Sequence, residues 1–254
     1  TTGNPKGVML SHSNLLAAGR YISSGHEVDH KDTALCVLPI YHINGLCVTV
    51  MGTLASASTL VLPDRFSVNA FWTLIETQRC TWFSAVPTQY SYILNNKSMP
   101  EKIPFLRFAR SASAPLSPEI HRKFEERFKI PIIETMGLTE TGSQISTNPL
   151  PPKVRKIGSP GKAFGNKLMI GNELSDEVSP GIIGEILVKG NNVMKGYFKQ
   201  PDETAKTITK EGWLKTGDLG YMDEDGYIYV TGRIKELIIK AVSYTHLTLP
   251  TNCV

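Results

Sequence analysis

The feature that most constrains the fold is an alternation of strand-like and helical patterns over residues 1–150. The apolar runs that read as strands are TALCVLPI (33–40), STLVLP (58–63), CTWFSAV (80–86), FLRFARSAS (105–113) and PIIETMG (131–137). Amphipathic segments between them predict helices at 67–79, 87–96 and 117–128. Strands separated by helices need crossover connections, so the alternation predicts a mainly parallel sheet covered by helices.

The pattern changes after about residue 155. KLMIGNEL, GEILVKG and GYIYVTG are short strand patterns separated by Gly, Asn, Asp and Pro turns. We therefore predict an α/β fold in which a parallel-sheet subdomain is followed by a small antiparallel β subdomain. The prolines of NPLPPKVRK (148–156) mark the boundary, which divides the chain into an α/β part, 1–152, and a β-rich part, 153–240.

Composition excludes several classes of protein. The 254 residues are 41% hydrophobic and carry a net charge of +4, with the charges interspersed. This balance is too mild to argue for binding to nucleic acid or an anionic membrane surface. The apolar stretch 45–62 is interrupted by Gly and Ser, so we read it as a helix and a strand, not a membrane span. The cysteines are far apart and suggest reduced, buried thiols in a cytoplasmic protein: Cys36, Cys47, Cys80 and Cys253.

The first candidate site is the opening stretch TTGNPKGVML, with Thr1, Thr2, Gly3 and Lys6. Its glycines permit a tight turn that offers backbone N–H groups and a cation to a phosphate. No Walker A loop and no G-x-G-x-x-G fingerprint after a strand occurs in the sequence. A flexible surface turn remains the alternative.

The second candidate is ETMGLTETG (134–142), which follows a predicted strand. Ligands of open α/β sheets bind at the carboxyl ends of strands. Thr139 and Glu140 would present a hydroxyl and a carboxylate there, groups suited to phosphate oxygens and Mg²⁺. An ordinary capped turn remains the alternative.

The third candidate is WLKTGDLGYMDEDGYIYVTGRIKELIIK (213–240). Asp218 lies on a Gly-flanked turn and could accept hydrogen bonds from both hydroxyls of a ribose. Arg233 follows a strand and could hold a hydroxyl or phosphate. Taken separately, both could be ordinary surface residues.

Six segments follow one another in the order in which a known family carries its motifs. They are TTGNPKGVMLSH, LPIYHINGL, SASAPL, ETMGLTETG, GEILVKGNNVMKGYFKQPDET and the segment at 213–240. From residue 1 to about 240 the chain resembles the adenylate-forming enzymes, the superfamily of acyl-CoA synthetases, firefly luciferase and peptide-synthetase adenylation domains. The fold expected from this resemblance is a fragment of the family's large N-terminal domain.

The resemblance also implies roles for individual residues. The loop of Thr1, Thr2, Gly3 and Lys6 would touch the ATP β- and γ-phosphates. Thr139 would contact phosphate, Glu140 would bind Mg²⁺, and Lys6, Thr139 and Glu140 together form the predicted catalytic set. Asp218, assisted by Arg233, would bind the ribose.

The base and the acid have their own implied residues. Those assigned to the adenine are Ser113, Ala114, Pro115, Met136 and Gly137, with Met136 where many relatives carry an aromatic. His42 falls where the family places a gate beside the acyl group, although a capped core histidine remains the alternative. Lys235 falls at the hinge of the family's C-terminal domain.

The implied activity is that of an ATP-dependent acid:CoA ligase acting on an aliphatic or fatty acid, with ATP, Mg²⁺ and CoA required. The carboxylate would form an acyl-adenylate with release of pyrophosphate, and the CoA thiol would then take the acyl group. Expected partners are therefore small molecules, with no nucleic acid and no transmembrane segment. A non-catalytic nucleotide-binding remnant and a peptide-synthetase-type adenylation domain remain alternatives.

The two ends depart from the family pattern. The chain starts inside a motif, so we expect an incomplete gene product. Residues 241–254, AVSYTHLTLPTNCV, contain no Asp, Glu, Lys or Arg and match nothing in the family. We expect an artefactual, non-family tail there, with a genuine divergent tail as the alternative.

Overall fold

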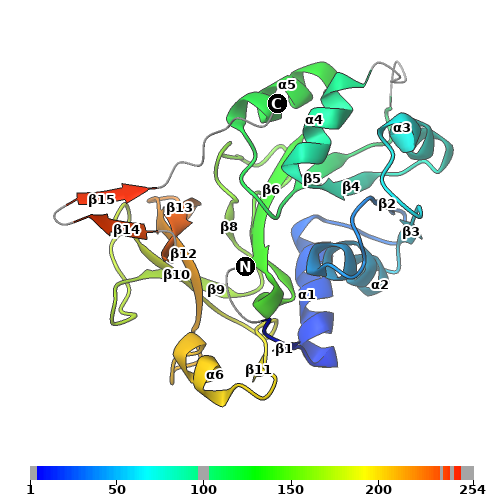
Figure 1. The fold of residues 1–254 in the computed structure, drawn as a ribbon. Helices are drawn as coiled ribbons and strands as arrows, with labels where there is room; N and C mark the ends of the chain where they lie inside the picture. The colour runs from blue at the N-terminus through cyan, green and yellow to red at the C-terminus, as the bar shows by residue number, and fades with distance from the viewer. Residues whose placement is uncertain (1–4, 97–102, 235–236, 241–242, 247–254) are drawn as a thin grey trace.

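A seven-stranded sheet forms the centre of the larger part of the protein (Figure 1). The computed structural model describes residues 5–96, 103–234, 237–240 and 243–246. The strands of the sheet, in spatial order, are β3 (Thr59–Val61), β2 (Thr33–Cys36), β4 (Trp82–Ala85), β5 (Phe108–Ser111), β6 (Ile132–Leu138), β7 (Ser143–Thr147) and β8 (Lys162–Ala163). Neighbours from β3 to β6 are parallel, and β7 and β8 continue the sheet antiparallel. The predicted parallel sheet is confirmed.

Helices cover both faces of this sheet. One face carries α3 (Val68–Thr77), α4 (Pro87–Asn95) and α5 (Pro118–Phe128). The other carries α1 (His12–Gly25) and the π-helix η1 (Asn44–Met51), which continues into α2 (Gly52–Ser56). Phe83 and Ala109 belong to the apolar cluster of the first face, and Trp82 and Phe108 to that of the second. This division follows from the strand geometry, in which successive side chains point to opposite faces.

A second, antiparallel sheet follows in the chain. Its order is β13 (Ile228–Arg233), β12 (Leu214–Met222), β10 (Gly184–Lys189) and β9 (Lys167–Gly171). The core of this sheet is continuous with the first one, because Ile145 of β7 is part of it and Met136 of β6 packs against it. The predicted antiparallel β region is confirmed. Strand β8 lies beyond residue 152 but still pairs with β7, and the division at 152/153 stays a prediction.

Short elements complete the described chain. They are β1 (Val8–Met9) paired with β11 (Gly196–Tyr197), the 3-10 helix η2 (Thr139–Thr141), α6 (Pro201–Thr207), and β14 (Leu237–Lys240) paired with β15 (Ser243–His246). Of the segment expected to be a non-family tail, only 243–246 is described, and its origin stays a prediction.

Two expectations about the interior are confirmed for the described residues. Cys36, Cys47 and Cys80 are buried free thiols, while Cys253 lies outside the described residues. The stretch 45–62 forms helices η1 and α2 and then strand β3. No helix in the described part of the chain is long and apolar enough to cross a membrane.

Candidate active site

Thr139 and Glu140 lie where β6 ends and turns into η2. Thr139 is exposed and Glu140 is half-buried. The amide of Met194 donates to the Glu140 carbonyl oxygen at 2.8 Å, which fixes the backbone of the turn. The turn needs glycine at 137, because a Cβ there would lie 1.8 Å from the carbonyl oxygen of Ser143. The sequence prediction of an exposed hydroxyl next to a carboxylate therefore agrees with the geometry.

The Glu140 carboxylate is held by Tyr197, a residue to which the sequence analysis gave no role. The Tyr197 hydroxyl donates to Glu140 Oε1 at 2.8 Å. Burial, together with the nearby Glu140 charge, raises the pKa of Tyr197. The phenol therefore stays protonated at neutral pH and remains a donor to the carboxylate.

Lys6 is brought to the same place by the pairing of β1 with β11. Its ammonium lies 4.8 Å from the centre of the Tyr197 ring and forms an ion pair with Glu203 Oε2 at 2.6 Å. Lys6 and Glu140 thus contact one tyrosine, one at the ring and the other at the hydroxyl. The structure thus places Lys6 and Glu140, two of the three predicted catalytic residues, on one tyrosine. It also shows Glu203 as the ion-pair partner of Lys6.

Asp218 and Arg233 face each other across β12 and β13. They are register partners, and Arg233 Nε lies 2.9 Å from Asp218 Oδ1. The carboxylate is 8% exposed, whereas the Arg233 side chain is 60% exposed. The turn before Asp218 is shaped by Glu185, whose Oε1 accepts from the Gly217 amide at 2.8 Å. Asp218 and Arg233 therefore form an ion pair and are not independent surface residues.

The residues assigned to the adenine lie on neighbouring strands. Ser113, Ala114 and Pro115 form an exposed loop after β5, and Gly137 is exposed near the end of β6. Since β5 and β6 are adjacent and parallel, both segments lie at the same edge of the sheet. Met136 is half-buried against the core of the second sheet.

His42 lies on the segment that leads from β2 into η1. Its side chain is exposed, and Nδ1 accepts from the Asn44 amide at 3.2 Å. The alternative interpretation as a core histidine is therefore wrong, because the residue lies outside the core. An exposed ring remains compatible with a role beside the acyl group.

Thr1, Thr2, Gly3 and Lys235 lie outside the described residues. The described residues contain no cluster of three or more His, Cys, Asp or Glu side chains arranged to hold a metal. A single carboxylate still fits Mg²⁺, which is held in nucleotide sites by one or two carboxylates together with phosphates and water.

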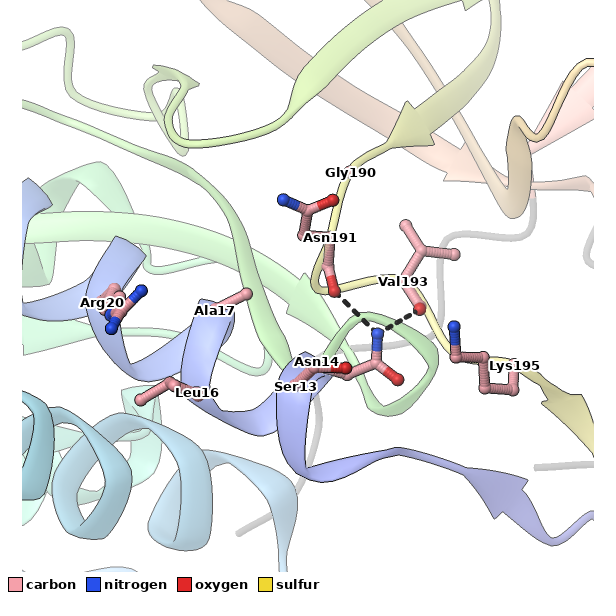
Figure 2. Close-up of a pocket in the computed structure, with 9 residues that line it drawn as sticks. All are labelled: Ser13, Asn14, Leu16, Ala17, Arg20, Gly190, Asn191, Val193 and Lys195. Carbon is pink, nitrogen blue, oxygen red and sulfur yellow. Dashed lines mark hydrogen bonds between the residues drawn. The ribbon is translucent and has the colours of Figure 1, made fainter.

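Side-chain amides of two asparagines fix the loop that carries Tyr197. Asn14 Nδ2 donates to the carbonyl oxygens of Asn191 and Val193, at 2.7 and 2.9 Å (Figure 2). Asn192 Nδ2 in turn donates to the Thr141 carbonyl oxygen at 2.9 Å. The start of α1, the 190–197 segment and η2 are therefore held as one unit.

The described part of the chain has two surface hollows, and the first of them lies beside this framework. One, of about 410 Å³, is lined by Asn14, Arg20 and Lys195 among others, and Figure 2 shows its lining. The other, of about 540 Å³, is lined by Arg107 and Arg155 among others. Of the predicted site residues that the structure describes, none lines either hollow.

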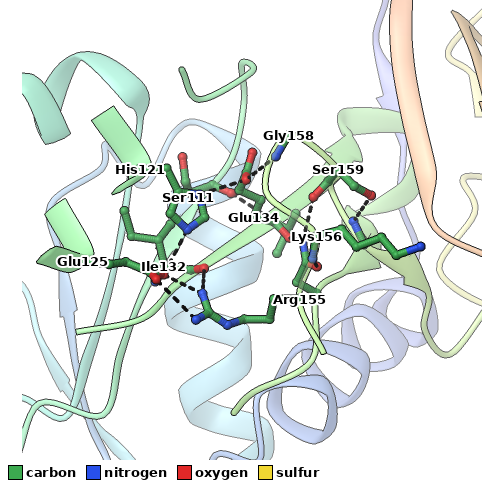
Figure 3. Close-up of polar contacts among 12 residues, drawn as sticks. Ser111, His121, Glu125, Ile132, Glu134, Arg155, Lys156, Gly158 and Ser159 are labelled. Atoms are coloured by element: carbon green, nitrogen blue, oxygen red, sulfur yellow. Dashed lines mark hydrogen bonds and ion pairs between the residues drawn. The ribbon is translucent and has the colours of Figure 1, made fainter. Parts of the chain in front are cut away.

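A charged network supports β6 from the side of α5 (Figure 3). His121 is buried, and its ring nitrogens lie 2.9 Å from both Glu134 Oε1 and Glu125 Oε1. Burial opposes the charged imidazolium, but hydrogen bonds to the two carboxylates prevail and raise the pKa of His121. Glu125 also pairs with Arg155. Despite its burial, hydrogen bonds from His121 and Arg155 lower the pKa of Glu125 to about 2. The network joins α5, β6 and the segment after β7 below the site.

Comparison with known proteins agrees with this geometry. The family model described as AMP-binding enzyme matches residues 1–198. Sulfoacetate–CoA ligase of Cupriavidus necator is 48% identical over 242 residues, and oxalate–CoA ligase of Arabidopsis thaliana is 40% identical over 243 residues. Each alignment covers 94% of this chain and 47% of the relative.

Solved structures of similar fold also match nearly the whole chain. ATP-bound MatB from Rhodopseudomonas palustris superposes with a TM-score of 0.90 at 33% identity, over 96% of this chain and 48% of that one. O-succinylbenzoate coenzyme A synthetase (MenE) from Bacillus subtilis, in complex with ATP and magnesium ion, superposes with a TM-score of 0.87 at 32% identity, over 96% of this chain and 50% of that one. The chain thus spans about half the length of the relatives it matches. It belongs to the AMP-binding enzyme family, as the order of its motifs predicted.

Proposed function

We propose that the protein carrying this chain is an ATP-dependent acid:CoA ligase that acts in the cytoplasm on an aliphatic acid. In the first step the acid carboxylate attacks the α-phosphorus of ATP and releases pyrophosphate. In the second, the CoA thiol attacks the acyl carbonyl and releases AMP. The observation that carries the proposal is the meeting of Lys6, Tyr197 and Glu140 beside the exposed hydroxyl of Thr139.

Negative charge on the phosphate oxygens dominates the first step, so the protein has to place cations and donors there. Lys6 would exchange Glu203 for a phosphate oxygen, and Thr139 would donate its hydroxyl. Tyr197 already binds Glu140 Oε1, so we assign Oε2 to the metal. Mg²⁺ bound there would neutralise phosphate charge.

The nucleoside would be oriented by the two sheets. Asp218 would accept from the ribose hydroxyls while Arg233 holds its carboxylate in place. The loop Ser113–Ala114–Pro115 and the pair Met136–Gly137 would bound the adenine. We assign Thr1, Thr2 and Gly3 to the remainder of the phosphate loop and Lys235 to the hinge, by resemblance alone.

For the acid, we propose a short aliphatic chain in preference to a fatty one, with His42 beside it. Support comes from relatives named for small acids, sulfoacetate and oxalate. The same names support CoA, rather than a carrier protein, as the acceptor. Fatty acids belong in any substrate panel as the contrasting class.

Acid-dependent exchange of pyrophosphate into ATP by the complete gene product tests the proposal. We expect exchange with at least one short acid and Mg²⁺, and its loss in Glu140→Gln. Glu173→Gln, which changes an exposed glutamate in the β-rich part, is the matched control and should retain exchange. The absence of exchange across short, fatty and aromatic acids would contradict the assignment.

A further inference from the structure

Arg110 is a charged residue that nucleotide binding does not use. It lies on β5, and its side chain is completely buried. It shares a face with Phe108, two residues earlier, and therefore points between the sheet and helices α1 and η1. A guanidinium in such a position is costly unless it is paired.

The partners of Arg110 are all neutral. Nη1 lies 3.1 Å from both Asn44 Oδ1 and Ser84 Oγ, and Nη2 lies 3.3 Å from Gln144 Oε1. Within the described ranges, no carboxylate forms an ion pair with it. Burial lowers the pKa of Arg110 to about 9, so the group is still charged at neutral pH.

Donors are left over around the guanidinium. Arg110 Nε and Gln144 Nε2 are both buried and have no hydrogen-bond partner in the described part of the structure. The two side chains are joined by the bond between Nη2 and Oε1. A cation whose partners are all neutral, with two neighbouring N–H groups that have no acceptor, is suited to binding an anion.

This cluster lies directly below the candidate site. Asn44, which accepts from Arg110, donates from Nδ2 to Ser113 Oγ at 3.0 Å. Ser113 is exposed in the loop after β5, so one side chain separates the guanidinium from the surface. Asn44 is also the first residue of the π-helix η1. Such helices are rare and occur frequently at functional sites.

We propose that Arg110 and Gln144 bind a second anionic group, a carboxylate or sulfonate, at the far end of the acid whose first carboxylate is activated. This inference rests on the proposed function and specifies its substrate class. Asn44 would turn aside to admit the acid. The anion would supply the countercharge that Arg110 lacks, whereas an alkyl group there would leave the cation unpaired.

The test compares acids that differ only in this charge. Sulfoacetate is paired with 3,3-dimethylbutanoate, malonate with 3-methylbutanoate, and oxalate with 2-methylpropanoate, so that an alkyl group replaces the anion at similar shape. The rate of pyrophosphate exchange gives kcat/KM for each acid with the complete gene product. We expect the dianion of the most active pair to exceed its partner by about 100-fold, since a site built for a polar group rejects an analogue that lacks it.

The Arg110→Met variant should lose about 100-fold in kcat/KM for the preferred dianion and change little for the alkyl analogue. Arg122→Met alters an exposed arginine on α5 and should leave both values within about twofold. Circular dichroism shows whether each variant is folded. An unchanged ratio in folded Arg110→Met would overturn the inference. If that variant does not fold, a wild-type preference below about tenfold overturns it equally.

Calorimetric titration of the same acids separates the two proposals. Dianion binding that needs Arg110, without exchange by any acid, would reject the ligase assignment and retain the anion subsite. Exchange that favours the alkyl acids would retain the ligase and reject the subsite. No binding and no exchange would reject both.

Discussion

Replacing Asp218 by Asn tests the nucleotide site at its most ordered point. The carboxylate is 8% exposed, and one oxygen already faces Arg233 Nε at 2.9 Å. Asparagine keeps the shape but retains only one acceptor oxygen. That oxygen should face Arg233, because the amide would otherwise turn its N–H donors toward the guanidinium. The ribose then loses its acceptor, and Arg233 loses its charged partner.

The two losses differ in size. Arg233 is 60% exposed, so its ion pair contributes at most about 1 kcal/mol to the free energy of unfolding. A hydrogen bond to a charged group contributes about 1.5–3 kcal/mol, which corresponds to roughly 10- to 150-fold in Kd. We therefore expect Asp218→Asn to weaken Mg-ATP binding by that factor, with little change in the midpoint of urea unfolding.

Calorimetric titration of Mg-ATP measures the effect, and 2′,3′-dideoxy-ATP identifies its origin. The wild-type protein should bind the dideoxy nucleotide more weakly than ATP, whereas the variant should bind both alike. Asp225→Asn, in the exposed turn between β12 and β13, is the matched control. Equal loss of affinity for both nucleotides in Asp218→Asn would refute the ribose assignment.

Two further predictions concern the supports of the site. His121 has a pKa raised above its ordinary value of 6.5, so its stabilising contribution is full below pH 6.5 and is lost as the pH rises through the folded value. The pKa of Glu125 is lowered from 4.5 to about 2, so its contribution is full above pH 4.5 and is lost as the pH falls toward 2. The network should therefore stabilise the fold most between pH 4.5 and 6.5, and urea unfolding of His121→Gln should lack the alkaline decline; an identical profile would count against this interpretation. Tyr197→Phe removes the donor to Glu140 and should raise the Mg²⁺ concentration needed for half-maximal exchange about 10- to 100-fold, whereas Tyr221→Phe should not. An unchanged Mg²⁺ requirement in Tyr197→Phe would contradict the assignment of Glu140 as the residue that binds Mg²⁺.

The parallel sheet could be predicted because its strands are continuous apolar runs separated by clear helical patterns. Helix α6 was missed although its signals are present: Pro201 at the first helical position, acidic residues in the first turn and Lys206 in the last. The π-helix η1 has no such signal. Its sequence, NGLCVTVM, is typical of any buried helix, and η1 makes long-range contacts, such as those of Asn44 with Arg110 and Ser113, that the local sequence does not indicate.

The same distinction applies to the site. Thr139, Glu140, Asp218 and Arg233 could be named because each lies in a recognisable local motif. Tyr197 also lies in such a motif, but its contact with Glu140 depends on long-range packing that includes the short pairing of β1 with β11. Arg110 was hidden inside a predicted strand, where only its position two residues after Phe108 marked it as inward-pointing. The identity of its neighbours required the structure.

The proposed function depends above all on activation of the acid by its transfer to the α-phosphate of ATP. Incubation of the complete gene product with Mg-ATP, CoA and an acid labelled with ¹⁸O in its carboxylate tests this directly. Mass spectrometry should find one ¹⁸O atom in the AMP released and none in inorganic phosphate. Label in phosphate, with ADP as the nucleotide product, would show an acyl-phosphate route and contradict the account.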